Sequence, residues 1–173
     1  MIYINSFKEI YWINQPEFPV TPIPNDKDPS EDLYKTDKDI GPEFRAEIRG
    51  QTQVMKCRIE IDKGYIGNGR SSLFRIPLWP LNDIWVGRPQ DGMCRNAWVI
   101  HDPLYETKGN MRHGFKGVRF YCNGAPARLS RKACDQLYRA IYEIEAPDEK
   151  RISKKDYFWL RTWGWMKWGK AKK

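Results

Sequence analysis

Two neighbouring stretches in which apolar and polar residues alternate constrain the fold of this chain more than any other feature. In residues 43–49 every second residue is apolar, and the same pattern returns after Gly50 in residues 55–62. Successive side chains of a β-strand point to opposite faces. The alternation therefore predicts an antiparallel hairpin with one buried face.

Two later stretches have the periodicity of helices instead. In residues 93–105 the apolar positions follow the i, i+3, i+4, i+7 spacing, and His101 lies on that apolar face. Ser130 is a suitable N-cap for a second helix over residues 131–145, and Pro147 ends it. We expect Asp135 one turn inside this second helix, beside its apolar stripe.

The two ends of the chain differ in composition from this body. Residues 15–30 contain five prolines, which predicts that they are extended and form no packed element. We therefore expect residues 1–42 to form an extended N-terminal arm. Residues 150–173 carry a net charge of +8 and many aromatic side chains, and they predict a C-terminal helix or tail. Such a tail can complete the core, dock on a partner or contact a lipid surface. Residues 43–149 then form the globular domain.

These patterns predict an α+β fold: a small antiparallel sheet, two antiparallel helices and an aromatic-rich C-terminal helix. We expect no signal peptide at the N-terminus, because Lys8 and Glu9 interrupt its apolar stretch. No stretch is apolar for long enough to predict a transmembrane helix. The four cysteines show no CxxC spacing, and we interpret them as reduced thiols.

Several kinds of site at His101 are disfavoured by spacing. A phosphohydrolase of the His…His-Asp…Asp type needs an earlier histidine, and none precedes His101. A zinc site would draw on cysteines and on His113, but no two candidates have finger-like spacing. A cysteine nucleophile needs a paired base, and Cys94 is better interpreted as a small buried hydrophobe.

A His–Asp system remains. If the two helices pack antiparallel, Asp135 can reach the imidazole of His101 and stabilise its charged form, so that His101 serves as a general base toward water. Tyr105 follows His101 at i+4 and shares its face. Asp102 points about 100° away on a helix of 3.6 residues per turn, and it is free to bind a cation with carbonyl groups near Gly87.

The pattern His-Asp-x-x-Tyr on one helix, with a second Asp on an antiparallel helix, resembles the secreted calcium-dependent phospholipases. The resemblance implies His101 as the base, Asp102 as a calcium ligand, Tyr105 as a supporting hydrogen-bond donor and Asp135 as the orienting carboxylate. It also implies a calcium cofactor bound at a Gly-rich loop that precedes the helix.

A wider resemblance covers residues 54–145 and the aromatic tail. The segments GYIGNGRSS, LWP, AWVIHDPLY and LSRKACDQLYRAI are similar to a family of uncharacterised tailed-phage proteins with an Ala-x-x-x-His-Asp-x-Leu-Tyr motif. Asn68 stands where that family has Asp. This resemblance implies a phage origin, location in the host cytoplasm or the virion, and other phage structural proteins or membrane lipid as partners.

The function that these residues predict is a phage accessory or virion-associated protein that hydrolyses an ester, with a lipid as the candidate substrate. The alternative is a non-catalytic virion or tail assembly component that docks through its N-terminal arm and its Trp-rich C-terminus. In that case His101 is a core histidine satisfied by Asp135 or by a backbone carbonyl. Nucleic acid is the less favoured partner, because the sequence shows no ordered basic and aromatic platform.

Overall fold

The computed structural model describes residues 2–14, 19–24, 33–68, 74–78, 81–86, 95–106, 108–109, 118–163, 165 and 168. The strands among them are β1 (Ile2–Ile4), β2 (Phe7–Trp12), β3 (Val20–Ile23), β4 (Leu33–Thr36), β5 (Glu43–Ile48), β6 (Val54–Ile61), β7 (Ile66–Asn68), β8 (Phe74–Leu78), β9 (Leu81–Val86), β10 (Val118–Cys122) and β11 (Ala125–Leu129). The helices are α1 (Arg95–Glu106), α2 (Arg131–Glu145), the 3₁₀-helix η1 (Pro147–Glu149) and α3 (Lys150–Trp163).

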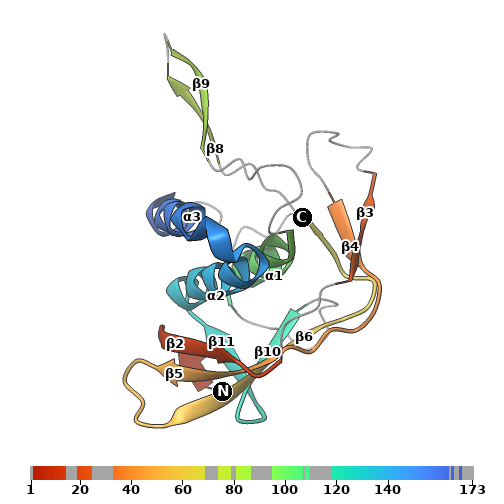
Figure 1. Cartoon of the computed structure of the whole chain (residues 1–173), viewed down its shortest axis with the longest axis vertical. Helices are drawn as coiled ribbons and strands as arrows, with labels where there is room; N and C mark the ends of the chain where they lie inside the picture. The colour runs from red at the N-terminus through yellow and green to blue at the C-terminus, as the bar shows by residue number, and fades with distance from the viewer. Residues whose placement is uncertain are drawn as a thin grey trace.

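The predicted hairpin, β5–β6, belongs to a six-stranded sheet with the order β1-β11-β10-β6-β5-β2 (Figure 1). Strands β5 and β6 pair antiparallel, with Ala46 opposite Met55, and Gly50 has a φ of +89° in the turn between them. The side chains of Phe44, Ala46 and Ile48 are buried. The prediction of a hairpin with one buried face is confirmed.

Strands β1 and β2 follow each other in the chain but lie at opposite edges of this sheet. β1 pairs parallel with β11, β2 pairs antiparallel with β5, and only Asn5 and Ser6 lie between the two strands. Two residues span about 10 Å at most, so the two edges of the sheet must approach each other, which curls the sheet toward a barrel. Residues 2–12 are therefore part of the body, and the prediction of an arm does not hold for them.

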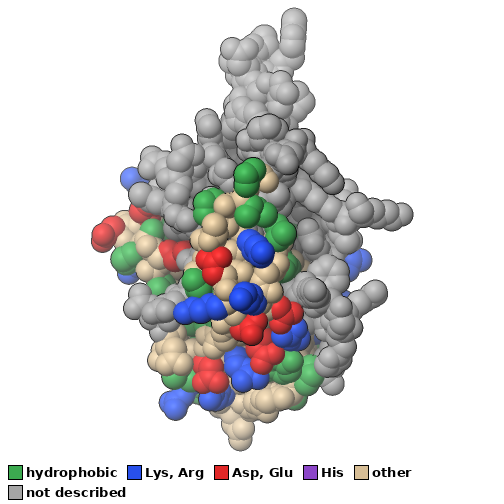
Figure 2. Space-filling view, turned by 90° about the vertical axis from the view of Figure 1, so that its right-hand side faces the viewer, with side chains coloured by type: hydrophobic (Ala, Val, Ile, Leu, Met, Phe, Trp, Pro, Cys, Tyr) green, Lys and Arg blue, Asp and Glu red, His purple; other side chains and the backbone are tan. Residues whose placement is uncertain are grey.

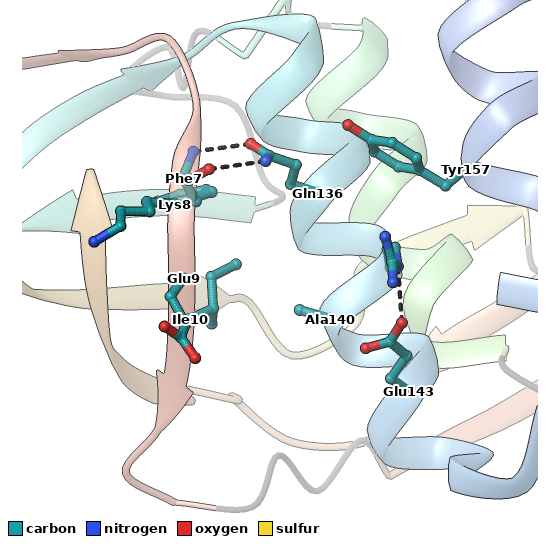
Figure 3. A pocket seen from close by; sticks show the side chains of 9 residues that line it. Phe7, Lys8, Glu9, Ile10, Gln136, Ala140, Glu143 and Tyr157 are labelled. Atoms are coloured by element: carbon teal, nitrogen blue, oxygen red, sulfur yellow. Dashed lines mark hydrogen bonds and ion pairs between the residues drawn. The ribbon is translucent and has the colours of Figure 1, made fainter. Parts of the chain in front are cut away.

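Helix α2 covers the seam where the two edges approach. Ser130, just before α2, donates its backbone N–H to Ile4 O at 2.9 Å. Six residues further on, the side-chain amide of Gln136 accepts from Phe7 N and donates to Phe7 O, both at 2.8 Å (Figure 3). The side chain of Gln136 thus satisfies both the N–H and the carbonyl group of Phe7. Phe7 begins β2, just after the chain has passed from β1 at one edge of the sheet to the other edge.

Part of the proline-rich stretch also forms a strand. β3 pairs antiparallel with β4, and β4 pairs with β7, in a separate three-stranded sheet. Pro22 lies inside β3, opposite Tyr34. Proline removes a backbone donor, which an edge strand such as β3 tolerates. The prediction that residues 15–30 form no packed element is thus wrong for residues 20–23, while residues 15–18 and 25–30 lie outside the described part.

The predicted helices are present and pack against one another. Ser130 caps α2 by accepting a hydrogen bond from Ala133 N at 3.1 Å, as predicted, and α2 ends just before Pro147. α2 contacts both α1 and α3, and Leu137 and Ile141 of its predicted stripe are fully buried. The three helices lie together on one side of the curled sheet (Figure 1).

The fold class is α+β, as predicted, but the main sheet is larger than the small sheet expected. The difference comes from β1, β2 and β11, which add three strands around the predicted hairpin and β10. β8 and β9 form a further two-stranded antiparallel hairpin. Among the described residues, no helix has the length and apolar character needed to cross a membrane.

Candidate active site

Helix α1 carries His101 and Tyr105 on one buried face. The two rings are i, i+4 neighbours, with centroids 4.0 Å apart and planes inclined at 37°. The helix continues through Pro103 to Glu106. Beyond it, Gly109 N donates to Leu104 O at 2.6 Å and Lys108 N donates to Tyr105 O at 3.2 Å, the pattern of a Schellman motif. Asp102 and Pro103 therefore do not mark the end of the helix.

Helix α2 presents Asp135 to this face, because the two helices run antiparallel. Near one end of the pair, Ala97 N donates to Glu145 Oε2 at 3.2 Å, while His101 faces Asp135 further along. The Ser130 cap sets where α2 begins and places Asp135 one turn later, next to the apolar residues that hold α2 in the core. The predicted antiparallel pairing is confirmed.

The predicted contact between His101 and Asp135 is also confirmed. His101 Nε2 lies 3.3 Å from Asp135 Oδ1, and Tyr105 donates its hydroxyl to the same oxygen through a short hydrogen bond. The side chains of His101 and Asp135 are 2% and 0% exposed. The structure thus brings together all three residues that were predicted as the catalytic group, and their catalytic role stays a prediction.

A fourth residue, Arg161 of α3, was not predicted. Its Nη1 lies 2.8 Å from Asp135 Oδ2, so the carboxylate has a hydrogen-bond partner on each oxygen and a cation beside it. Arg131 of α2 holds this end of α3 by donating to Leu160 O at 2.8 Å and to Arg161 O at 3.1 Å. A buried carboxylate requires a charge partner, and that requirement is the signal that could have directed attention to the arginines of the C-terminal helix.

The environment keeps the Tyr105 hydroxyl protonated. Burial raises the pKa of Tyr105 well above its ordinary value of 10.0, and the negative charge of Asp135 raises the pKa further. A protonated phenol can only donate to a carboxylate. Tyr105 therefore acts as a permanent hydrogen-bond donor that orients Asp135 toward the imidazole.

Aromatic rings enclose the rest of the site. The ring of Tyr138 lies 5.3 Å from that of His101, and the ring of Trp168 lies 5.0 Å from that of Tyr105 at 90°. Trp168 brings part of the Trp-rich tail against the core, whereas Phe158 and Trp165 are 60% and 62% exposed. The described part of the tail therefore combines core packing with exposed aromatic surface.

The predicted metal ligands cannot be placed in the same way. Gly87 and the side chain of Asp102 lie outside the described residues, as do Cys94 and His113 of the zinc alternative. Within the described residues, no group of three or more His, Cys, Asp or Glu side chains is arranged to hold a metal ion. Asp135 is already engaged by Arg161, which leaves it unsuited to act as a calcium ligand.

A groove of about 320 Å³ lies apart from the His101 site, between β2, α2 and α3 (Figure 3). It was not predicted from the sequence, since its two walls are more than 100 residues apart in the chain. Its walls are mostly polar and include the ion pair between Arg139 and Glu143, whose atoms lie 2.7 Å apart. Its lining residues are Phe7, Lys8, Glu9, Ile10, Gln136, Arg139, Ala140, Glu143 and Tyr157.

No family model matches this sequence, and no curated protein or solved structure matches it either. The two family resemblances seen in the sequence therefore stay predictions.

Proposed function

We propose that this chain is a phage accessory or virion-associated protein in which His101 and Asp135 activate water to hydrolyse an ester. The observation that carries the proposal is the shared oxygen Asp135 Oδ1, which receives both His101 Nε2 and the Tyr105 hydroxyl. This is the arrangement that the resemblance to calcium-dependent phospholipases implies for these residues. The phage assignment rests on the sequence resemblance over residues 54–145.

The hydrogen bonds indicate which ring nitrogen acts as the base. A carboxylate only accepts hydrogen bonds, so Nε2 of His101 carries the proton that points to Asp135, and Nδ1 carries the lone pair. In the proposed reaction Nδ1 takes a proton from water as the water oxygen attacks the ester carbonyl carbon. Asp135 stabilises the resulting imidazolium, which then gives its proton to the leaving alcohol.

Calcium is part of this proposal through the resemblance alone. Asp102 and carbonyl groups near Gly87 would hold the ion, which would polarise the ester carbonyl. Asp102 directly follows His101 in α1, so both roles would be supplied by one helix. Membrane lipid is the candidate source of the ester.

A second candidate function is a non-catalytic component of the virion or tail. It is favoured by the near-complete burial of His101 and by the occupation of both Asp135 oxygens, which also suit a polar cluster that only stabilises the core. The exposed aromatic side chains of Phe158 and Trp165 would then contact other phage structural proteins. On the face drawn in Figure 2, the described acidic and basic side chains are interspersed, so the described part of that face offers nucleic acid no continuous basic surface.

Hydrolysis is tested with the purified full-length chain, chromogenic short-chain esters and phosphatidylcholine vesicles, each with calcium and with a chelator. We expect turnover that needs calcium. We also expect His101→Asn to lower kcat by roughly 10²- to 10⁴-fold, because it removes the general base. The matched control is Asp148→Asn, an exposed acidic residue outside the site, which should retain full turnover.

The turnover of a variant is compared with that of the wild type only if the variant is folded, as shown by a thermal unfolding midpoint. Unchanged turnover in folded His101→Asn would remove His101 as the base. If no ester is hydrolysed, the second candidate function is tested by measuring how much of the Phe158→Ser and Trp165→Ser variants is incorporated into phage particles. Reduced incorporation of these surface variants would support docking, and normal incorporation would count against it.

A further inference from the structure

Cys57 and Cys122 face each other across two neighbouring strands of the main sheet. They are directly opposite in the antiparallel pairing of β6 with β10. The next pair along, Lys56 and Asn123, is hydrogen-bonded, since Asn123 N donates to Lys56 O at 2.7 Å. Hydrogen-bonded and non-hydrogen-bonded pairs alternate in an antiparallel ladder, so Cys57 and Cys122 form a non-hydrogen-bonded pair, in which the Cα atoms approach to about 4.5 Å.

The two sulfur atoms are already in contact. Cys57 Sγ lies 3.4 Å from Cys122 Sγ, and both residues are 0% exposed. Disulfides need Cα atoms roughly 4.4–6.8 Å apart and a sulfur separation of about 2.05 Å. The Cα spacing typical of a non-hydrogen-bonded pair falls within that range, so rotation of the side chains would supply most of the remaining approach of the sulfurs.

We infer that Cys57 and Cys122 are a reversible disulfide site, oxidised by a peroxide and restored by a dithiol. The Cys122 thiolate attacks one peroxide oxygen, which releases the other oxygen as water and leaves Cys122 as a sulfenic acid. The Cys57 thiol then attacks the Cys122 sulfur and expels a second water. In sum, two thiols and one hydrogen peroxide give one disulfide and two waters, so the sulfurs lose two electrons to the peroxide.

The surroundings support Cys122 as the attacking sulfur. A hydrogen bond from Cys57 lowers the pKa of Cys122, whereas burial raises the pKa of Cys134 well above its ordinary value. Cys122 also directly precedes the exposed turn Asn123–Gly124, where both residues have positive φ, at 48° and 76°. The hydrogen bonds between two strands open locally at the ends of the strands, next to turns. Such an opening would give peroxide a route to Cys57 and Cys122.

The disulfide would join β6 and β10, and the whole of α1, the helix that carries His101, lies between these two strands in the sequence. It would close the chain from residue 57 to residue 122, a span that contains α1. Closing a long loop restricts the unfolded chain and so stabilises the folded one. This effect does not depend on the proposed hydrolysis.

The test uses the reduced full-length protein, treated with hydrogen peroxide under native conditions and analysed by intact mass and by non-reducing peptide mapping. We expect a mass loss of two hydrogens, a peptide that links residues 57 and 122, and complete reversal by dithiothreitol. We also expect oxidation to raise Tm by about 5–10 °C. Cys57→Ala and Cys122→Ala should each abolish the link and the rise in Tm.

Cys134→Ala is the matched control, because Cys134 is also a buried thiol but lies on α2. It should form the link and show the rise in Tm as the wild type does. The inference would be overturned by a link that forms only in denaturant. Pairing of Cys94 or Cys134 in place of either partner would also overturn it, as would irreversible oxidation of Cys122 without a link.

Discussion

Two buried aspartates, Asp135 and Asp156, are stabilised in different ways. Asp135 has the guanidinium of Arg161 at 2.8 Å in addition to His101 and Tyr105. Asp156 of α3 accepts a hydrogen bond from the Tyr138 hydroxyl at 3.3 Å, and burial raises its pKa from 3.8 to about 6. Burial of a carboxylate is costly in its charged form, so Asp156 is a point of weakness in the folded state near neutral pH.

We expect Asp156→Asn to stabilise the protein in a pH-dependent way. The pKa of Asp156 is higher in the folded state than in the unfolded state, so its contribution to stability falls as the pH rises from about 4 to about 6 and is constant above that. The variant should exceed the wild type by on the order of 2 kcal/mol near neutral pH, and this difference should shrink toward about pH 4. Chemical denaturation at several pH values measures it.

Asp148→Asn is the control for this experiment, since Asp148 is exposed and its replacement should leave the pH dependence unchanged. A difference between Asp156→Asn and the wild type that is the same at every pH would contradict the assigned cause.

At the scale of elements, the end of α1 depends on a close backbone contact. Gly109 has a φ of +62°, and a Cβ added to it would overlap the backbone carbonyl of Leu129. Gly109 also makes a backbone hydrogen bond to α1 and another to β11. Its N–H donates to Leu104 O, and its carbonyl accepts from Leu129 N at 3.1 Å. This glycine therefore ties the end of the helix that carries His101 to strand β11.

We expect Gly109→Ala to lower the free energy of unfolding by roughly 3 kcal/mol or more, because it combines a strained φ with a clash against backbone that cannot move aside. Gly50→Ala is the matched control. Gly50 also has a positive φ, but a Cβ there would meet nothing within 4 Å, so only the conformational cost of about 1 kcal/mol applies. Equal losses in the two variants, measured by urea denaturation, would show that the contact with Leu129 does not matter.

At the scale of the whole molecule, a few long-range contacts hold the curled sheet and the helices together. The Gln136 amide joins α2 to the N-terminal strand across 129 residues of sequence. Arg131 and Arg161 join α2 to α3. The His–Asp cluster lies where α1, α2 and α3 meet, so its geometry depends on both sets of contacts.

We expect Gln136→Glu to lower the free energy of unfolding by about 1–3 kcal/mol. A carboxylate can still accept from Phe7 N, but it cannot donate to Phe7 O, and two oxygens would then face each other at the seam of the sheet. The same substitution at an exposed site, Gln51→Glu, is the control and should change stability by less than about 0.5 kcal/mol. Comparable unfolding midpoints for the two variants in urea would argue against a role for Gln136 at the seam.

The candidate site shows how far the residues alone could lead. His101 and Tyr105 could be placed together because i, i+4 neighbours share a helix face. Asp135 could be placed opposite them because the Ser130 cap sets the position of α2 and an antiparallel partner brings the two apolar faces together. The contact of Arg161 with Asp135 could not be predicted. Arg161 is one of several basic residues in the C-terminal stretch, and nothing in the sequence distinguishes it from those whose side chains are solvated.

What the sequence determined by itself is local: the β5–β6 hairpin, the bounds of α2, the face of α1 and the aromatic C-terminal helix. Each follows from periodicity or capping within a window of a few residues. Only the tertiary structure decided that β1 and β2 occupy opposite edges of one curled sheet, that Cys57 meets Cys122, and that Arg161 neutralises Asp135. These pairings join residues between 26 and 125 positions apart, and the local pattern around either partner does not specify which distant group will satisfy it.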